Sequence, residues 1–288
     1  MTAIGYGSDD PADQGKFEKY WPADLHLIGK EILWFHAVYW PAMLFALDLP
    51  LPKRLFAHGW WTSEGRKMSK SMGNFVGLEK LRDLASKYGG FDAIRYYLLR
   101  AAPFGSDLDW TDGDFNKSFN ELANVLGNCL NRTIKMIGRY RNGALPTTGE
   151  RESIDDALIA RTEEFGKQIS DAYEKLELQQ CALLPVELAR ATNGYIDATA
   201  PFTLAKDPAK ASRLDTVLNL SAQAISLALA GLLPVMPQKA AEGLRQLNIN
   251  VDDGKTLADL FRPLVAGHKL GEGQPLFPKL DSPGEKGK

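Results

Sequence analysis

The sequence predicts an α/β fold followed by an all-α fold. The first quarter of the chain reads strand, helix, strand and glycine-flanked loop, which is a βαβ pattern. From residue 115 onward no segment reads as a strand, and helical patterns follow one another. We therefore divide the chain into residues 1–74, a mixed region at 75–114, and a helical region at 115–288.

The first region supplies the parallel sheet. Residues 25–28 are a short apolar strand candidate, and a long apolar helix is expected at 31–47, ending before two prolines that stop helix continuation. Residues 54–61 read as a second strand that enters the glycine-flanked loop. This βαβ unit predicts a parallel sheet whose ligand lies at the carboxyl ends of the strands.

The mixed region is expected to hold two helices and a loop. Residues 78–88 are amphipathic and end at Gly89-Gly90, which is a helix-terminating signal. Residues 91–100 form the second helix, and residues 104–114 are expected to be an acidic loop.

The third region predicts an antiparallel helical bundle. Its apolar periodicities are separated by turns such as Asn142-Gly143, and short turns make consecutive helices antiparallel neighbours. The expected helices are 115–141, 153–176, 178–199, 214–233 and 237–247.

Composition narrows the class of protein. The formal net charge of −2 neither indicates nor excludes a nucleic-acid binder. The two cysteines, Cys129 and Cys181, have no partner at C-x-x-C spacing, so we expect no structural zinc and no disulfide scaffold, as in a reducing cytosol. No apolar run reaches membrane-spanning length, and we expect no membrane partner.

The most informative stretch is residues 65–74, which read G-R-K-M-S-K-S-M-G-N. Glycines let the backbone approach a ligand, and two lysines three positions apart can hold phosphate oxygens. Such a loop can neutralise the charge that develops as pyrophosphate leaves. A solvated basic turn is the alternative for a bare K-x-x-K pattern.

An aromatic helix precedes this loop. It carries Trp34, Phe35, His36, Tyr39 and Trp40, with His36 and Trp40 on one face because they are four positions apart. From the pattern alone a core role is favoured about two to one over ligand binding.

A polar stripe marks the long helix expected at 115–141. Asn124, Asn128 and Arg132 are spaced by four, and amide and guanidinium groups can read the bases of single-stranded loops. From the spacing alone, a solvated helix face is favoured.

These motifs together resemble the methionyl-tRNA synthetase family. Residues 67–71 spell the K-M-S-K-S loop of class I aminoacyl-tRNA synthetases without a mismatch. That loop also suits the leucine, isoleucine, valine and cysteine enzymes. The methionine family is distinguished by H-L-I-G-K-E-I at 26–32, F-H at 35–36, Y-W-P-A at 39–42 and H-G-W at 58–60.

The resemblance implies a C-terminal part of a Rossmann-type class I catalytic domain, a small linker subdomain and an anticodon-binding bundle. It implies ATP-dependent formation of methionyl-adenylate and transfer of methionine to tRNA(Met), with Mg²⁺ accompanying ATP, in the cytoplasm. By family position, the catalytic loop residues would be Lys67, Ser69, Lys70 and Ser71. ATP would be bound by Lys70, Gly29, Glu31 and Trp61; methionine by His36 and Trp40; and the anticodon by Asn128, Arg132 and Phe202.

The sequence departs from the family pattern at three points. Glu31 stands where the family has aspartate, and Phe202 stands where it has tryptophan. The His-x-Gly-His phosphate motif is absent. We therefore expect the carboxyl half of a synthetase, inactive without an amino half that would be a separate chain or lost by truncation. The alternatives are a non-catalytic anticodon-binding module and, less favoured, an unrelated nucleotidyltransferase of the same fold.

Overall fold

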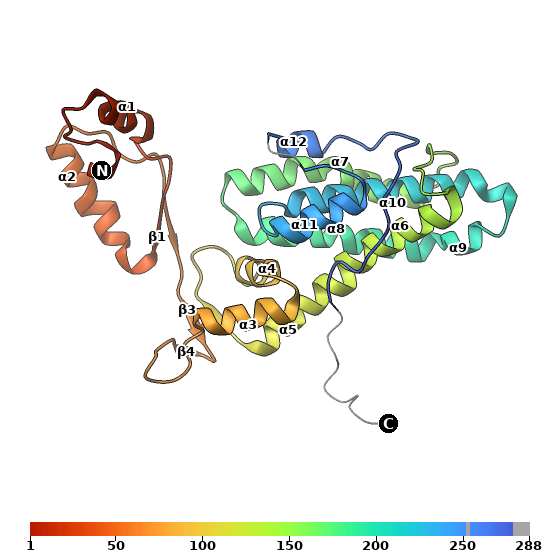
Figure 1. Cartoon of the computed structure of the whole chain (residues 1–288), viewed down its shortest axis with the longest axis horizontal. Coiled ribbons are helices and arrows are strands. Elements are labelled where there is room, and N and C mark those ends of the chain that lie inside the picture. The colour runs from red at the N-terminus through yellow and green to blue at the C-terminus, as the bar shows by residue number, and fades with distance from the viewer. Residues whose placement is uncertain (252–253, 279–288) are drawn as a thin grey trace. The chain divides into compact units, whose positions relative to one another are not determined.

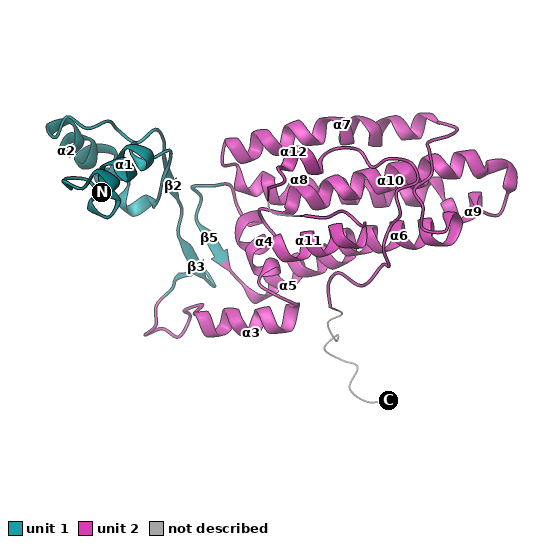
Figure 2. Cartoon of the chain, turned by 45° about the horizontal axis from the view of Figure 1, so that its top comes forward, with its two compact units in different colours: residues 1–68, 104–109 teal, residues 69–103, 110–288 magenta. Residues whose placement is uncertain are grey.

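The computed structural model describes residues 1–251 and 254–278, and the chain divides into two compact units. The first unit contains residues 1–68 and 104–109, and the second contains residues 69–103 and the chain from residue 110 (Figures 1 and 2). The boundary after Met68 falls within the K-M-S-K-S loop.

The first unit is built on a parallel strand pair. Strand β1, His26–Gly29, pairs with strand β2, Leu55–His58, so that His26 lies opposite Leu55 and Gly29 opposite His58. A helical connection joins the two strands, which confirms the predicted βαβ unit. The N-terminal part adds a 3₁₀ turn at Thr2–Ile4 and helix α1 at Pro11–Tyr20.

The helix expected at 31–47 is present but changes type along its length. A 3₁₀ turn at Lys30–Ile32 is followed by a π-helical turn at Phe35–Tyr39 and by α2 at Trp40–Ala46. The backbone N–H of Trp40 donates to the Phe35 carbonyl, five residues earlier. Pro41 follows and has no N–H to donate, which favours the irregular hydrogen bonding at this point.

Two predictions in this part of the chain were wrong in extent. The strand expected at 54–61 ends at His58, and Trp61–Ser63 is strand β3 of a second sheet, with the order β4-β3-β5. Strand β4 is Arg66–Lys67 and strand β5 is Leu108–Trp110. The expected acidic loop at 104–114 therefore contains a strand, and Asp112 already begins a helix, because Thr111 caps it by accepting the Asp114 N–H.

The second unit is helical. The long helix expected at 115–141 begins at Asp112 and is interrupted by a π-helical segment, Leu122–Gly127. The α-helices are α3 Leu78–Tyr88, α4 Asp92–Arg100, α5 Asp112–Glu121, α6 Asn128–Arg141, α7 Ser153–Glu174, α8 Leu178–Thr199, α9 Pro201–Leu204, α10 Ala211–Leu232, α11 Pro237–Gln246 and α12 Leu257–Leu260, with a 3₁₀ turn at Pro208–Lys210.

Helix α10 is the centre of the bundle. It packs against α7, α8, α6 and α11, and its Leu218, Ile225 and Leu229 side chains are fully buried. No apolar run of membrane-spanning length was expected from the sequence, but the segment Pro208–Leu232 is long and apolar enough to cross a membrane. However, 78% of its most apolar window is buried inside the protein. Its apolar character is therefore that of a core helix.

A buried ion pair ties three of these helices together. The Arg213 guanidinium on α10 donates to both carboxylate oxygens of Asp155 on α7, at 2.9 and 2.8 Å. The Tyr195 hydroxyl on α8 donates to the same carboxylate at 2.7 Å. The carboxylate also accepts the backbone N–H of Glu152 and so caps α7.

Candidate active site and nucleic-acid interface

Gly29 and Glu31 lie together at the carboxyl end of β1. A Cβ atom at Gly29 would lie 2.4 Å from the Glu31 Oε2 atom, so glycine leaves the space that this carboxylate occupies. Glu31 Oε2 accepts the Trp60 indole N–H at 2.8 Å. This hydrogen bond, with one from its own backbone N–H, lowers the pKa of Glu31 below its usual value.

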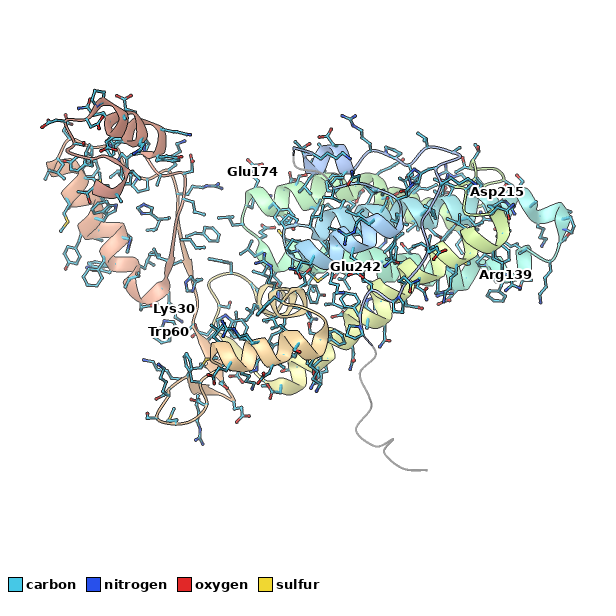
Figure 3. The ribbon with its side chains drawn as sticks, viewed as in Figure 1. Lys30, Trp60, Arg139, Glu174, Asp215 and Glu242 are labelled. Carbon is cyan, nitrogen blue, oxygen red and sulfur yellow. The ribbon has the colours of Figure 1, made fainter. Side chains whose placement is uncertain are left out.

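Trp60 and Lys30 form the polar neighbourhood of that carboxylate. The Lys30 ammonium lies 4.7 Å from the centroid of the Trp60 ring (Figure 3). Lys30 also pairs with Asp107 at 2.5 Å, and the Trp60 backbone N–H donates to the same Asp107 oxygen at 2.8 Å. The Lys30 hydrogen bond, followed by that from Trp60, lowers the pKa of Asp107.

His36 and Trp40 are half-buried on the face of the helix that packs inward. The His36 Nδ1 atom is 3.0 Å from the Ile32 carbonyl, and its ring meets that of His26 edge-on at 6.1 Å. Burial, and then the nearby His36, lower the pKa of His26. The Trp40 ring packs edge-on against Trp21, and its indole N–H is buried with no hydrogen-bond partner in the described chain.

The remaining aromatic residues of this helix do not lie in a core. Trp34 is 63% exposed, Phe35 58% and Tyr39 50%, and the exposed fractions of Met43 and Phe45 are 58% and 68%. The core interpretation of the aromatic pattern is therefore wrong for these residues. The helix is apolar on all sides, but it buries only the face that carries His36, Trp40 and Leu44.

The K-M-S-K-S loop, residues 67–71, spans the boundary of the two units. Lys67 is the last residue of β4, where it lies opposite Thr62 of β3, and Trp61 begins β3. In the second unit, the Ser69 N–H donates to Asn74 Oδ1 at 2.9 Å, and the Ser69 and Ser71 hydroxyls are 2.7 Å apart. These contacts form a turn on which the Lys70 side chain is exposed, with its ammonium 5.9 Å from the centroid of the Phe75 ring.

The polar stripe divides into two parts. Asn124 and Asn128 are exposed and line a groove of about 670 Å³ together with Asn120, Asn131 and residues 275–278. Arg132 lies outside this lining and pairs with Asp197 on α8 at 2.6 Å. Phe202, on α9, is 56% exposed.

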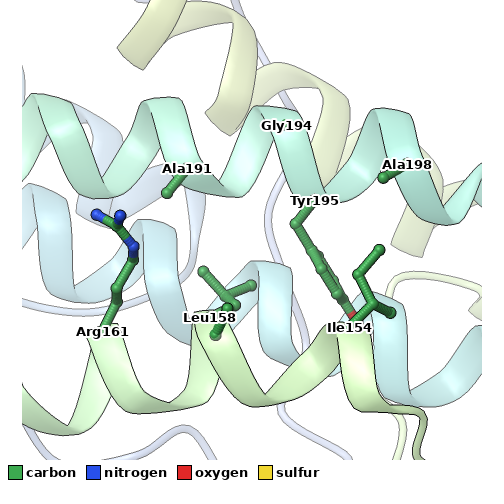
Figure 4. A pocket seen from close by; sticks show the side chains of 8 residues that line it. Ile154, Leu158, Arg161, Ala191, Gly194, Tyr195 and Ala198 are labelled. Carbon is green, nitrogen blue, oxygen red and sulfur yellow. The ribbon is translucent and has the colours of Figure 1, made fainter.

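A smaller pocket contains none of the expected site residues. Its volume is about 270 Å³, and it lies between α7 and α8 (Figure 4). Small side chains of α8 line it, namely Ala191 and Ala198, together with Gly194. The described part of the chain contains no group of three or more His, Cys, Asp or Glu side chains that could hold a metal ion. Both cysteines are free and buried, and burial raises the pKa of each thiol.

Sequence reasoning missed Trp60 and Asp197, which bond to the expected site residues Glu31 and Arg132, and Asp107, which bonds to Trp60. Trp60 lies in the H-G-W motif but was given no role, and Asp107 was placed in a loop. The S-D-L-D-W pattern at 106–110 carries the alternation of a strand and could have located Asp107. No sequence signal pairs Asp197 with Arg132, because they are 65 residues apart.

Comparison with known proteins gives one consistent result. The family model "tRNA synthetases class I (M)" matches residues 1–134. The chain is 43% identical over 284 residues to the methionine–tRNA ligase of Caldanaerobacter subterraneus subsp. tengcongensis, and 42% identical over 285 residues to that of Bacillus subtilis. Each match covers 98% of this chain but only 43% and 42% of the relative.

Solved structures agree with this result. A Mycobacterium tuberculosis methionyl-tRNA synthetase in complex with methionyl-adenylate superposes with a TM-score of 0.86 at 33% identity. The match covers 96% of this chain and 54% of that one. The apo form of the enzyme from the same organism superposes with a TM-score of 0.84 at 31% identity, over 98% of this chain and 54% of that one.

Proposed function

We propose that this chain, a homologue of class I methionyl-tRNA synthetases that spans less than half the length of its curated relatives, serves the attachment of methionine to tRNA(Met). The reaction would form methionyl-adenylate from methionine and ATP and then transfer methionine to the tRNA. The observation that carries the proposal is the complete K-M-S-K-S loop within a match that covers 98% of the chain.

The chain's own residues would act by positioning and electrostatics. Lys67 and Lys70 would hold the β- and γ-phosphates and neutralise charge as pyrophosphate leaves the α-phosphate. Ser69 and Ser71 would shape the turn that carries Lys70, which agrees with their mutual hydrogen bond. Mg²⁺ would be bound chiefly through the phosphates of ATP, as is usual for this ion.

Glu31 would accept a hydrogen bond from a ribose hydroxyl, with Gly29 leaving room for the nucleotide and the Trp61 backbone near adenine. The chemistry of the group supports this role, because a carboxylate has several acceptor sites and Glu31 can accept a hydroxyl hydrogen bond besides that of the Trp60 indole. His36 and Trp40 would line the methionine pocket, where aromatic edges suit a thioether. The unpartnered indole N–H of Trp40 is a donor that a bound ligand could satisfy.

The helical region, residues 115–288, would read the anticodon through Asn128, Arg132 and Phe202. The exposure of Asn128 and Phe202 supports this role, since splayed bases stack on aromatic rings and bond to amides. Residues 1–74 would form the catalytic part and residues 75–114 the linker subdomain.

A separate amino-terminal part would be the protein partner, and the complex would charge tRNA in the cytoplasm. The helix that carries His36 and Trp40 exposes apolar side chains, and this exposure supports the partnership, because parallel sheets and all-apolar helices are normally covered.

The test is methionine-dependent ATP–pyrophosphate exchange, measured for the chain alone and with the part of the B. subtilis relative that this chain does not match. Exchange that requires both components, and that Lys70→Ala abolishes, would establish the function. Exchange by the chain alone would disprove the need for a partner.

A non-catalytic anticodon-binding module is the second candidate. The asparagine-lined groove favours it, because this groove lies wholly within the helical unit and needs no nucleotide site. Binding of tRNA(Met) without pyrophosphate exchange, both by the chain alone and with the added part of the relative, would support this candidate and refute the first.

A further inference from the structure

Trp60 is the centre of a set of contacts that joins three parts of the first unit. Its indole N–H donates to Glu31, its backbone N–H donates to Asp107, and its ring lies under the Lys30 ammonium. The backbone and the indole ring of Trp60 are therefore both held in place. The indole direction, and with it the position of the bonded Glu31 oxygen, is set by these contacts.

Asp107 links Lys30 to the backbone of Trp60. One oxygen, Oδ1, accepts both the Trp60 backbone N–H and the Lys30 ammonium, so the lysine is held over the tryptophan ring. The chain on either side of Asp107 is also fixed. The Leu108 N–H donates to the Trp60 carbonyl at 2.8 Å, and a Cβ at Gly59 would lie 2.0 Å from the Ser106 carbonyl oxygen.

We propose that Asp107 is a positioning residue for the nucleoside end of the ATP site, because it orients Trp60 and Trp60 in turn orients the Glu31 carboxylate. This inference rests on the proposed function, since Glu31 acts on a ribose hydroxyl only if the chain binds ATP.

The side chain of Glu31 explains why such a constraint is needed. Glutamate has one more rotatable bond than the aspartate expected from the family resemblance, so its carboxylate samples more positions. An exposed ion pair such as Lys30–Asp107 adds little stability on its own. The contribution of Asp107 is therefore to geometry: it removes conformational freedom from the carboxylate before the ligand arrives.

The first experiment follows the indole N–H resonance of Trp60 in the whole chain, labelled with ¹⁵N-tryptophan, between pH 3.5 and 6. This resonance should shift as Glu31 titrates, with a midpoint below the usual glutamate pKa. The charged groups around Glu31 are Lys30, His58 and Asp107. Trp60→Phe assigns the resonance, and Glu31→Gln must remove the pH-dependent step.

Asp107→Ala should remove most of this step, because the indole no longer points at Glu31. Asp109→Ala is the matched control: Asp109 bonds to Thr62 and to the Gly65 N–H, so the step should persist. If Asp107→Ala shifts the indole resonances of all six tryptophans, the fold has changed. Asp107→Asn is then the deciding variant, and a reduced pH-dependent step of its Trp60 resonance supports the proposal. A step as large in Asp107→Asn or Asp107→Ala as in the native chain overturns the proposal.

The second experiment separates this inference from the proposed function. Asp107→Ala should weaken ATP binding about tenfold, the value of a lost hydrogen bond to a charged group, and leave pyrophosphate binding unchanged. Equal weakening of ATP binding and pyrophosphate binding would overturn the positioning role. Absence of ATP binding by the native chain, alone and with its complement, would refute the proposed ATP site, while the indole titration still decides whether Asp107 orients Glu31.

Discussion

Replacement of Arg213 by alanine tests how the helical unit is held together. Arg213 is 2% exposed and Asp155 is fully buried, and the guanidinium donates to both carboxylate oxygens. Removing one partner of such a pair leaves an uncompensated buried charge, which costs about 3–5 kcal/mol of unfolding free energy. Tyr195→Phe removes one hydrogen bond to the same carboxylate and should cost about 1.5–3 kcal/mol.

The assay is urea unfolding of the whole chain, followed by far-ultraviolet circular dichroism. This signal reports mainly the helical unit, whereas tryptophan fluorescence reports mainly the first unit, since only Trp110 lies in the second. Arg151→Ala is the matched control: the Arg151–Asp156 pair is exposed and should contribute about 0–1 kcal/mol.

The effect of pH gives an independent check. Burial opposes ionisation of Asp155, but the hydrogen bonds from Arg213, the Glu152 backbone and Tyr195 outweigh it and lower the pKa of this carboxyl. A lowered pKa contributes stability above the unfolded value of about 3.9, and this stability is lost as pH falls through the folded value. Arg213→Ala removes the largest of these lowering contacts, so the pKa of Asp155 rises. The stability difference from the native chain should therefore shrink as pH falls. A cost below about 1 kcal/mol at pH 7, or a difference independent of pH, would refute this reasoning.

Three further predictions concern the first unit and the proposed activity. Gly59→Ala places a Cβ 2.0 Å from the backbone oxygen of Ser106, so the unfolding free energy of the first unit should fall by about 1–3 kcal/mol. An unchanged urea midpoint of the tryptophan fluorescence would contradict the close approach. Lys70→Ala, in the chain with its complement, should slow pyrophosphate exchange about 10²–10³-fold and leave tRNA affinity intact; equal losses would disprove the phosphate role. Arg132→Ala should weaken tRNA(Met) binding by about 1–3 kcal/mol without affecting exchange, and slower exchange would count against anticodon reading.

The parts of the fold that the sequence predicted best are those with local signals. The helix at 78–88 was predicted with its observed bounds, because Gly89 takes the left-handed conformation that ends it. The helix at 178–199 likewise combines strong periodicity with Pro201 just beyond its end. Strand β5 was missed although Leu108–Trp110 alternates apolar and polar residues, because the strand is short and its pairing partner β3 is far away in the sequence.

The candidate site shows the same limit. Motif matching selected Gly29, Glu31 and Lys70, but it could not reveal that Glu31 bonds to Trp60 or that Asp107 reaches Lys30 from 77 residues away. It also could not show that Arg132 is paired with Asp197. Long-range polar contacts leave no local signal in the sequence, whereas helix caps and apolar faces do.

The first unit combines the expected nucleotide and methionine residues with a very small core. Its buried apolar side chains are Trp21, Ile28 and Leu44, while the helix that carries His36 exposes most of its aromatic rings. Burial of apolar area is the main source of stability, so this unit gains little from its own packing. A polypeptide that covers the exposed helix would therefore stabilise the fold and hold His36 and Trp40 in place through the same contacts. On this argument folding of the first unit and assembly of the proposed site are one coupled step, and the complement that restores exchange should also raise the urea midpoint of the tryptophan fluorescence.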